Sequence, residues 1–308
     1  MPAKNHPHDN YFNNPLIFTH TELIATKMEE LTRNNEFIIS TVLGFIVIFW
    51  ICFTILGFSV FKIATGASNF LFDRYIMMKY TLNYQEKATL DYKIPFYKNM
   101  KPSLKRKFEC SVKYFISKKI FEGREGCIVT DDMKLMVAAA ACQISFGHFP
   151  TIYEHFKKII IYPDKYFSGQ TQRYHLGEVQ SNGVIKLSWA AFTEGLRIKN
   201  DGIHVGFHEM AHALKIEDST LHDMEHCFMD KKALSDFHRY SNERIKTFTE
   251  GTFMRDYAFS NSEEFFAVSI EYFFEMPSQL RKNEPVVYEY LTRILNLDPL
   301  NHTSPVIS

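Results

Sequence analysis

The pattern of apolar and polar positions sets one long apolar run apart from the rest of the chain. Residues 37–61, FIISTVLGFIVIFWICFTILGFSVF, contain no charged side chain. At about 1.5 Å of rise per residue, a helix of this length exceeds the ~30 Å hydrocarbon core of a bilayer. A buried core helix is rarely apolar on every side for so long, and the apolar run of a cleaved signal peptide is shorter and nearer the N-terminus. The run therefore predicts one transmembrane helix, with bounds at 36–63.

The sequence after this run has the periodicities of amphipathic helices and short strands. Two short runs rich in β-branched or alternating apolar residues predict strands at 157–163 and 183–189. Apolar residues at helical spacing predict helices at 101–119, 133–146, 202–215, 231–248, 261–275 and 284–296. Because helices come first, then strands, then helices again, we expect an α+β fold that is mostly helical with a small sheet.

These patterns predict five consecutive regions. They are a polar, disordered segment at 1–35, the transmembrane helix at 36–63, a juxtamembrane linker at 64–100, a folded domain at 101–300 and a tail at 301–308. Two basic residues precede the span closely (Lys27, Arg33) and three follow it (Lys62, Arg74, Lys79). This small excess favours a single-pass protein with its C-terminal domain in the cytoplasm.

Composition and charge narrow the classes of function. Lys+Arg and Asp+Glu both number 35, so the net charge is zero and gives no reason to expect direct binding of nucleic acid. The five cysteines include no C-x-x-C pair, which indicates neither a disulfide framework nor a cysteine-ligated zinc site. Scattered free thiols agree with a reducing compartment.

The candidate chemistry lies in the helix predicted at 202–215. His208, Glu209 and His212 match the pattern H-E-x-x-H. Residues four apart share one face of a helix, so both imidazoles can reach one Zn²⁺ ion. Glu209 can then accept a proton from a metal-bound water whose pKa the zinc lowers, which is the chemistry of a zinc hydrolase. The alternative is a pair of hydrogen-bonded histidines on a core helix.

A second pattern competes for the metal. Residues 222–226, HDMEH, match the inverted motif H-x-x-E-H, with His222 and His226 as its histidines. Their flanks are polar and lack a long apolar stripe, so a solvated helix or loop is the simpler interpretation.

Two histidines leave zinc short of protein ligands. The strongly apolar segment at 257–277 offers three carboxylates. Glu264 and Glu271 are seven residues apart and share one face, whereas Glu263 points about a quarter-turn away. Ser260 with Glu263, or Asn261 with Glu264, also fits a local capping box. Spacing alone therefore leaves the third ligand open.

Together these segments resemble the Mlc titration factor A family of zinc metallopeptidases, whose catalytic domain is in turn similar to that of anthrax lethal factor. The similarity runs from about residue 105 to 300 and is far more specific than the five-residue motif. Its segments, in the family's order and at similar spacing, are KKIFEGREGCIVTDDMKLMVAAAACQISFG, IIIYPDKYF, GE at 177–178, GVIKLSW, DGIHVGFHEMAHALK and EEFFAVSIEYFFEMP. A zincin-like metallopeptidase domain is therefore expected.

The resemblance implies roles for particular residues. Glu264 matches the family's third zinc ligand, and Tyr257 matches its active-site tyrosine, which would stabilise the oxyanion. Glu271 would be a supporting carboxylate. The segment 183–189 would be the edge strand along which an extended substrate lies.

Three features depart from the family pattern. His204 stands where the family usually has Asn, and Lys215 stands where it usually has Asp. The predicted transmembrane helix is the third, since the well-known member is soluble.

Three functions are compatible with these residues. The first is a membrane-anchored zinc peptidase acting on peptides or proteins, which the joint presence of the five candidate site residues favours. The second, implied by the family's name, is an interaction protein that sequesters a transcription regulator. The third is a zinc hydrolase of non-peptide substrates. The segment 216–230 is also long enough to cover the cleft as a lid.

Overall fold

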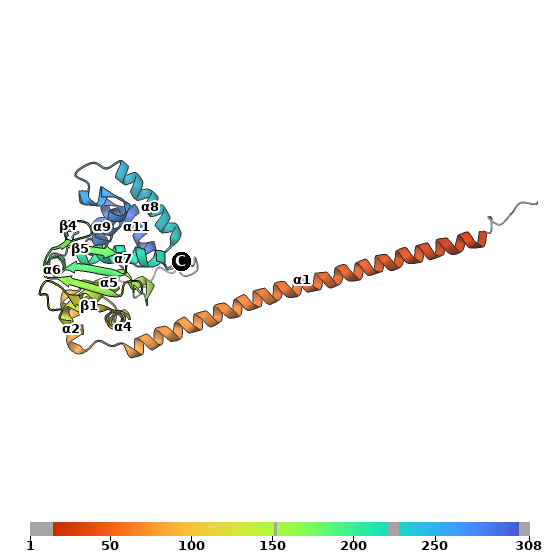
Figure 1. Cartoon of the computed structure of the whole chain (residues 1–308), viewed down its shortest axis with the longest axis horizontal. Coiled ribbons are helices and arrows are strands. Elements are labelled where there is room, and N and C mark those ends of the chain that lie inside the picture. Colours follow the sequence, from red (N-terminus) through yellow and green to blue (C-terminus); the bar gives the residue numbers. More distant parts are fainter. Residues whose placement is uncertain (1–14, 151–152, 221–227, 302–308) are drawn as a thin grey trace, which may run out of the picture. The chain divides into compact units, whose positions relative to one another are not determined.

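The structure is a computed structural model that describes residues 15–150, 153–220 and 228–301. The chain forms two compact units, Met1–Leu71 and Phe72–Ser308. Helix α1 (Pro15–Lys79) contains the apolar run in the first unit, and its last turns belong to the second (Figure 1).

The predicted transmembrane helix is not confirmed. Across the part of the chain that the structure describes, no helix offers a stretch long and apolar enough to cross a bilayer.

The second unit alternates helices and strands in an α+β arrangement, as predicted. Every helix and strand expected in the domain is present, with ends within a few residues of the prediction. The first half contains α2 (Tyr84–Lys93), α3 (Pro95–Lys98), α4 (Pro102–Lys118), β1 (Ile120–Gly123), α5 (Asp131–Ile144), a 3₁₀ turn (Phe146–His148), β2 (Lys158–Tyr162), β3 (Tyr166–Ser168) and β4 (Arg173–His175). The second half contains β5 (Gly177–Gln180), β6 (Val184–Ser188), α6 (Trp189–Arg197), α7 (Val205–Thr220), α8 (Lys231–Lys246), a 3₁₀ turn η2 (Asp256–Ser260), α9 (Ser262–Glu275), α10 (Pro277–Asn283) and α11 (Pro285–Ile294).

The main sheet has four strands in the order β1-β2-β6-β5. Strands β1, β2 and β6 are parallel, and β5 runs antiparallel to β6 with Gly177 opposite Leu187. The segment 183–189, expected as the edge strand, is therefore an inner strand, because β2 and β5 pair with its two sides. The edge strand on this side is β5, and β3 and β4 form a separate two-stranded hairpin.

Residues expected to form the linker at 64–100 are instead part of the domain from α2 onward. Leu82, Leu90, Ile94 and Tyr97 are buried in the main hydrophobic core. Burying each such side chain contributes about 1.5–3 kcal/mol. The folded domain thus begins well before the predicted boundary at residue 101.

The core positions the helices that contain the candidate site. Helix α5, predicted from its nearly all-apolar sequence to be central, is buried from Leu135 to Ile144 and packs on α4 and α7. Helix α7 also contacts α9 and the edge strand β5. The candidate residues on α7 therefore face a helix on one side and a free strand edge on the other.

Candidate metal centre

Helix α7 presents the two histidines of the motif on one face. His208 and His212 are one turn apart, and their Nε2 atoms lie 3.2 Å from each other. The helix begins at Val205, and its N-terminus is capped by the His204 ring, whose Nδ1 accepts the N–H of Phe207 at 3.2 Å. This cap fixes the first turn of α7, and with it the direction in which the helix face with His208 and His212 points.

Helix α9 brings Glu264 to the same point. The side chain of Asn261 caps this helix by accepting the N–H groups of Glu263 and Glu264 at 2.9 and 3.0 Å. Oxygen atoms of Glu264 lie 3.1 Å from Nε2 of His208 and 3.7 Å from Nε2 of His212. Glu264 is thus the carboxylate that meets both histidines, whereas the exposed Glu263 forms an ion pair with Lys215 at 2.6 Å.

The three groups fit a zinc ion. Ligand atoms at zinc–nitrogen distances of about 2.0–2.1 Å form a tetrahedron with edges of about 3.3 Å. The separations of 3.2, 3.1 and 3.7 Å among His208, His212 and Glu264 are close to that length. Oε2 of Glu264 is buried and faces Nε2 of His208 at 3.1 Å, with no other hydrogen-bond partner among the described residues, so its lone pairs are directed to the point where a metal would bind.

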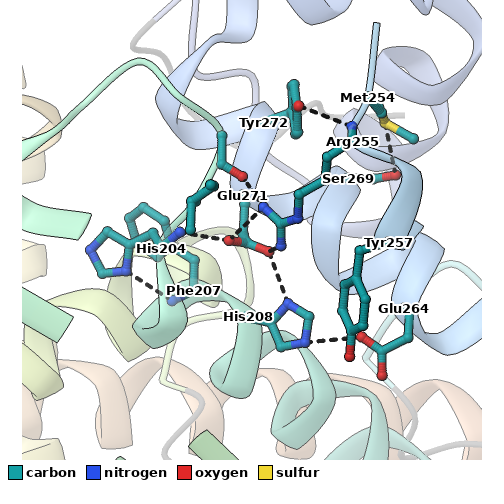
Figure 2. Close-up of polar contacts among 12 residues, drawn as sticks. His204, Phe207, His208, Met254, Arg255, Tyr257, Glu264, Ser269, Glu271 and Tyr272 are labelled. Atoms are coloured by element: carbon teal, nitrogen blue, oxygen red, sulfur yellow. Dashed lines mark hydrogen bonds and ion pairs between the residues drawn. The ribbon is translucent and has the colours of Figure 1, made fainter. Parts of the chain in front are cut away.

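A buried network holds His208 in place (Figure 2). Glu271, which is 1% exposed, accepts the Nδ1–H of His208 at 2.8 Å and the backbone N–H of His204 at 2.6 Å. Arg255 forms a two-point ion pair with the same carboxylate, at 2.5 and 3.3 Å. When His208 is neutral and its proton is on Nδ1, held by Glu271, Nε2 presents its lone pair toward Glu264 and His212.

The pKa shifts of the site residues indicate that this point favours positive charge. Burial disfavours the charged forms of both His208 and Glu264, but the contacts of His208 with Glu264 and Glu271, and those of Glu264 with His208 and His212, outweigh it. As a result, the pKa of Glu264 is held well below its usual range, and the pKa of His208 is raised to about 10. A cation at this point would compensate the negative charge of Glu264, because Glu271 already pairs with Arg255.

Glu209 lies in the same cleft, beside the three candidate metal ligands. The cleft has a volume of about 390 Å³ and is lined by α7, by η2 and the start of α9, and by β5 with the preceding His175. Glu209 is 6% exposed, and burial raises the pKa of its carboxyl to about 7, partly offset by His208 and His212. A carboxyl with a pKa near neutrality is well matched to accept and return a proton.

The edge strand is fitted closely to this carboxylate. A Cβ atom added at Gly177 would overlap the side chain of Glu209. Replacing Gly177 with alanine is therefore expected to displace the Glu209 carboxylate, and to lower any hydrolytic activity about tenfold or more with little change in metal content. Activity and zinc content measured in parallel would check this. Gly169→Ala is a matched control, because a Cβ there meets no atom within 4 Å; equal activity in both variants would contradict the expectation.

Tyr257 is placed at the mouth of the cleft by η2. Its side chain is 51% exposed, and its ring centre lies 6.0 Å from that of His208. Figure 2 shows the phenol directed toward the carboxylate of Glu264. Partial burial and the charge of Glu264 raise the pKa of Tyr257 to about 12, so the hydroxyl keeps its proton at neutral pH.

The remaining sequence candidates divide into those outside the described residues and those within them. The rival motif at 222–226, with His222 and His226, lies outside the described residues, as does the middle of the predicted lid. Burial lowers the pKa of His204 to about 4, so this ring is neutral and acts as a helix cap on the far side of Glu271. Within the described residues, the one group of three possible metal ligands is His208, His212 and Glu264.

Two contributors were not predicted. Arg255 is distant in sequence from its partner Glu271, and nothing in local spacing pointed to that pair. Gly177 stood in one of the segments compared with the family, but its closeness to Glu209 depends on the sheet order.

Comparison with known proteins identifies a family and several relatives with similar sequences. Residues 71–295 match the model of the glucose-regulated metallo-peptidase M90 family. An uncharacterized protein of Synechocystis sp. is 27% identical over 234 residues, which cover 69% of this chain and 84% of that protein. Mlc titration factor A of Yersinia pestis is 28% identical over 172 residues, 47% of this chain, and so is that of Yersinia pseudotuberculosis; the match spans 60% of those relatives.

The family match covers more than half of the chain, and the relatives named Mlc titration factor A agree with the resemblance found in the sequence. The chain belongs to the glucose-regulated metallo-peptidase M90 family.

Proposed function

We propose that this chain is a zinc-dependent peptidase in which His208, His212 and Glu264 hold the metal and Glu209 is the general base. The observation that carries the proposal is the convergence of the three ligand groups at one point, with the buried carboxylate of Glu209 in the same cleft. Zinc bound by these side chains supplies a Lewis acid that polarises a carbonyl group and acidifies water.

The remaining steps belong to the chain's own residues. Glu209 takes a proton from the attacking water and returns it to the leaving amine. The hydroxyl of Tyr257 donates a hydrogen bond to the oxyanion that develops on the substrate carbonyl. Glu271 and Arg255 keep the His208 ring oriented during these steps.

The edge strand β5 suggests how a substrate is held. Its inner side pairs with β6, and Gly177, Glu178 and Val179 line the cleft beside the metal-binding groups. An extended peptide that pairs with the outer side of β5 would add a fifth strand and bring its scissile bond toward Glu209.

Replacing Tyr257 with phenylalanine tests this assignment. Loss of one oxyanion donor is expected to lower kcat by about 10²-fold while KM changes little, because the hydrogen bond strengthens only in the transition state. The measurement is steady-state hydrolysis of a substrate found in a peptide library. If the zinc-loaded wild type cleaves no peptide in such a library, the peptidase proposal fails.

A regulatory role is the second candidate, favoured by the similarity to proteins named Mlc titration factor A. In that case the chain would sequester a transcription regulator, and hydrolysis would be secondary. The third possibility, a non-peptide substrate, would show in the same substrate screen.

We also propose that residues 36–63 attach the chain to a membrane, with the catalytic unit on the cytoplasmic side. Support comes from the uncharged sequence of 37–61 and from the apolar side chains between residues 42 and 53, each about half or more exposed to solvent. Release of the full chain from membranes by alkaline carbonate would contradict it.

A further inference from the structure

A second cavity lies behind the first turn of α7. It has a volume of about 250 Å³ and lies among α3, α5, α6, α7 and α9. The residues that line it and those that line the metal cleft have no member in common. A molecule in this space would therefore be separate from the candidate metal ligands. We refer to it as the rear cavity.

The interior of the rear cavity is aromatic. The ring centre of Phe274 lies 5.4 Å from that of Phe207 and 6.0 Å from that of Phe96, and all three rings line the space together with Ile94 and Leu196. An apolar cavity of about 150 Å³ already binds benzene, so a phenyl ring fits here. The walls thus favour a ligand with a small apolar or aromatic body.

Two lysines contribute positive charge to the same lining. Lys93 follows the polar helix α2 and Lys199 follows α6. Lys199 is exposed and forms no ion pair within the described residues. The side chain of Lys93 is 39% exposed and lies 3.7 Å from Asp132, whose side chain is 64% exposed; such a surface pair is weak. Because both lysines reach solvent, they mark the mouth of the cavity and can pair with an anion there.

The one acidic residue of the lining does not cancel this charge. Burial, together with the charges of Asp201 and Glu271, raises the pKa of Glu275 to about 8, so this carboxyl is mostly protonated at neutral pH. The buried His204 ring is neutral, as described above. The lining therefore has a net positive charge at pH 7, which complements an anionic group on a ligand.

A buried amide in the wall adds a hydrogen-bond donor. Gln143 is 5% exposed, and its side chain lines the rear cavity without a hydrogen bond to the described part of the chain. Buried side-chain amides normally have a partner, and an amide N–H₂ group can donate to a carboxylate. The unpartnered Gln143 amide is a second indication, independent of the lysines, that this space holds a polar ligand group.

We propose that the rear cavity binds a small monocarboxylic acid with an aromatic or branched apolar body. The apolar body lies among Phe96, Phe207 and Phe274, and the carboxylate pairs with Lys93 and Lys199 at the mouth. The Gln143 amide supplies a further donor. This binding depends neither on peptidase activity nor on zinc.

The probe is 3-phenylpropionate, titrated at pH 7 into the full zinc-loaded chain and followed by saturation-transfer NMR. Saturable binding is expected. The uncharged 3-phenylpropionamide has the same shape and should bind at least tenfold more weakly, because it loses the charge-assisted contacts. The double variant Lys93→Met/Lys199→Met should weaken binding of the acid at least tenfold. Lys98→Met, which removes an exposed lysine outside the lining, is the matched control and should bind as the wild type does.

Two further variants separate the rear cavity from the metal centre. Leu196→Trp, which fills the rear cavity, should abolish binding, whereas His212→Ala, which lacks a candidate metal ligand, should keep it. Loss of binding in His212→Ala but not in Leu196→Trp would place the carboxylate on the metal and overturn the proposal. Absence of saturable binding to the wild type, equal affinity for the acid and its amide, or unchanged affinity in the double lysine variant would also overturn it.

Discussion

Replacing Glu209 with glutamine is expected to lower peptide hydrolysis by about 10³-fold and to leave one zinc bound per chain. The reason is that the amide keeps the shape of the side chain but cannot accept a proton from water. Glu209 is adjacent to the metal-binding groups and is not one of the three whose ligand atoms converge. Hydrolysis and bound zinc should be measured on the same preparation.

Glu263→Gln is the matched control for this variant, because it makes the same change in the same cleft at an exposed carboxylate. It should keep hydrolysis within a few-fold of the wild type. Equal losses in both variants would mean that Glu209 acts through the charge of the cleft and not as the base. If a binding partner is found, its retention by Glu209→Gln would separate sequestration from catalysis.

Replacing Glu271 with leucine is expected to damage both stability and metal binding. The change leaves Arg255 without its two-point ion pair and leaves the N–H groups of His204 and His208 without an acceptor. Breaking such a buried pair costs about 3–5 kcal/mol of unfolding free energy. Loss of the group that orients His208 should weaken zinc binding about 10–100-fold.

Urea unfolding of the zinc-free protein and competition with a zinc chelator measure the two effects separately. Glu271→Gln should lie between leucine and the wild type, because it keeps one acceptor and the side-chain volume. Zinc affinity unchanged in Glu271→Leu would show that the position of His208 does not depend on this carboxylate.

Periodicity predicted the main elements because their apolar faces are packed in one core. The helix at 133–146 is nearly all apolar, and it is correspondingly buried as α5. The stretch 80–100 was different, because α2 is polar apart from a few positions such as Leu90 and α3 has only four residues. Burial of these positions depends on contacts with distant segments, which local spacing does not reveal.

Part of the candidate site could be predicted from the sequence for a similar reason. His208, Glu209 and His212 are related by helical spacing, so one helix was enough to group them. The choice among Glu263, Glu264 and Glu271 depended on how α9 is rotated against α7. The cap at Asn261 and the packing of the two helices set that rotation.

The edge strand could not be assigned from alternation. Strand β6 alternates because buried and partly exposed positions alternate along it, whereas β5 has only four residues and none is fully buried. Its sequence therefore shows no alternation that would mark a strand. Only the pairing of Gly177 with Leu187 shows that the cleft is bordered by β5.

Elemental analysis of zinc bound to the full chain tests the central claim most directly. About one zinc per chain is expected in the wild type and in Glu263→Ala, and it should be lost in Glu264→Ala and in His208→Ala. The double variant His222→Ala/His226→Ala should keep it. Zinc retained by Glu264→Ala and His208→Ala but lost from the double variant, or a well-folded wild type that binds no zinc when it is supplied, would contradict the account.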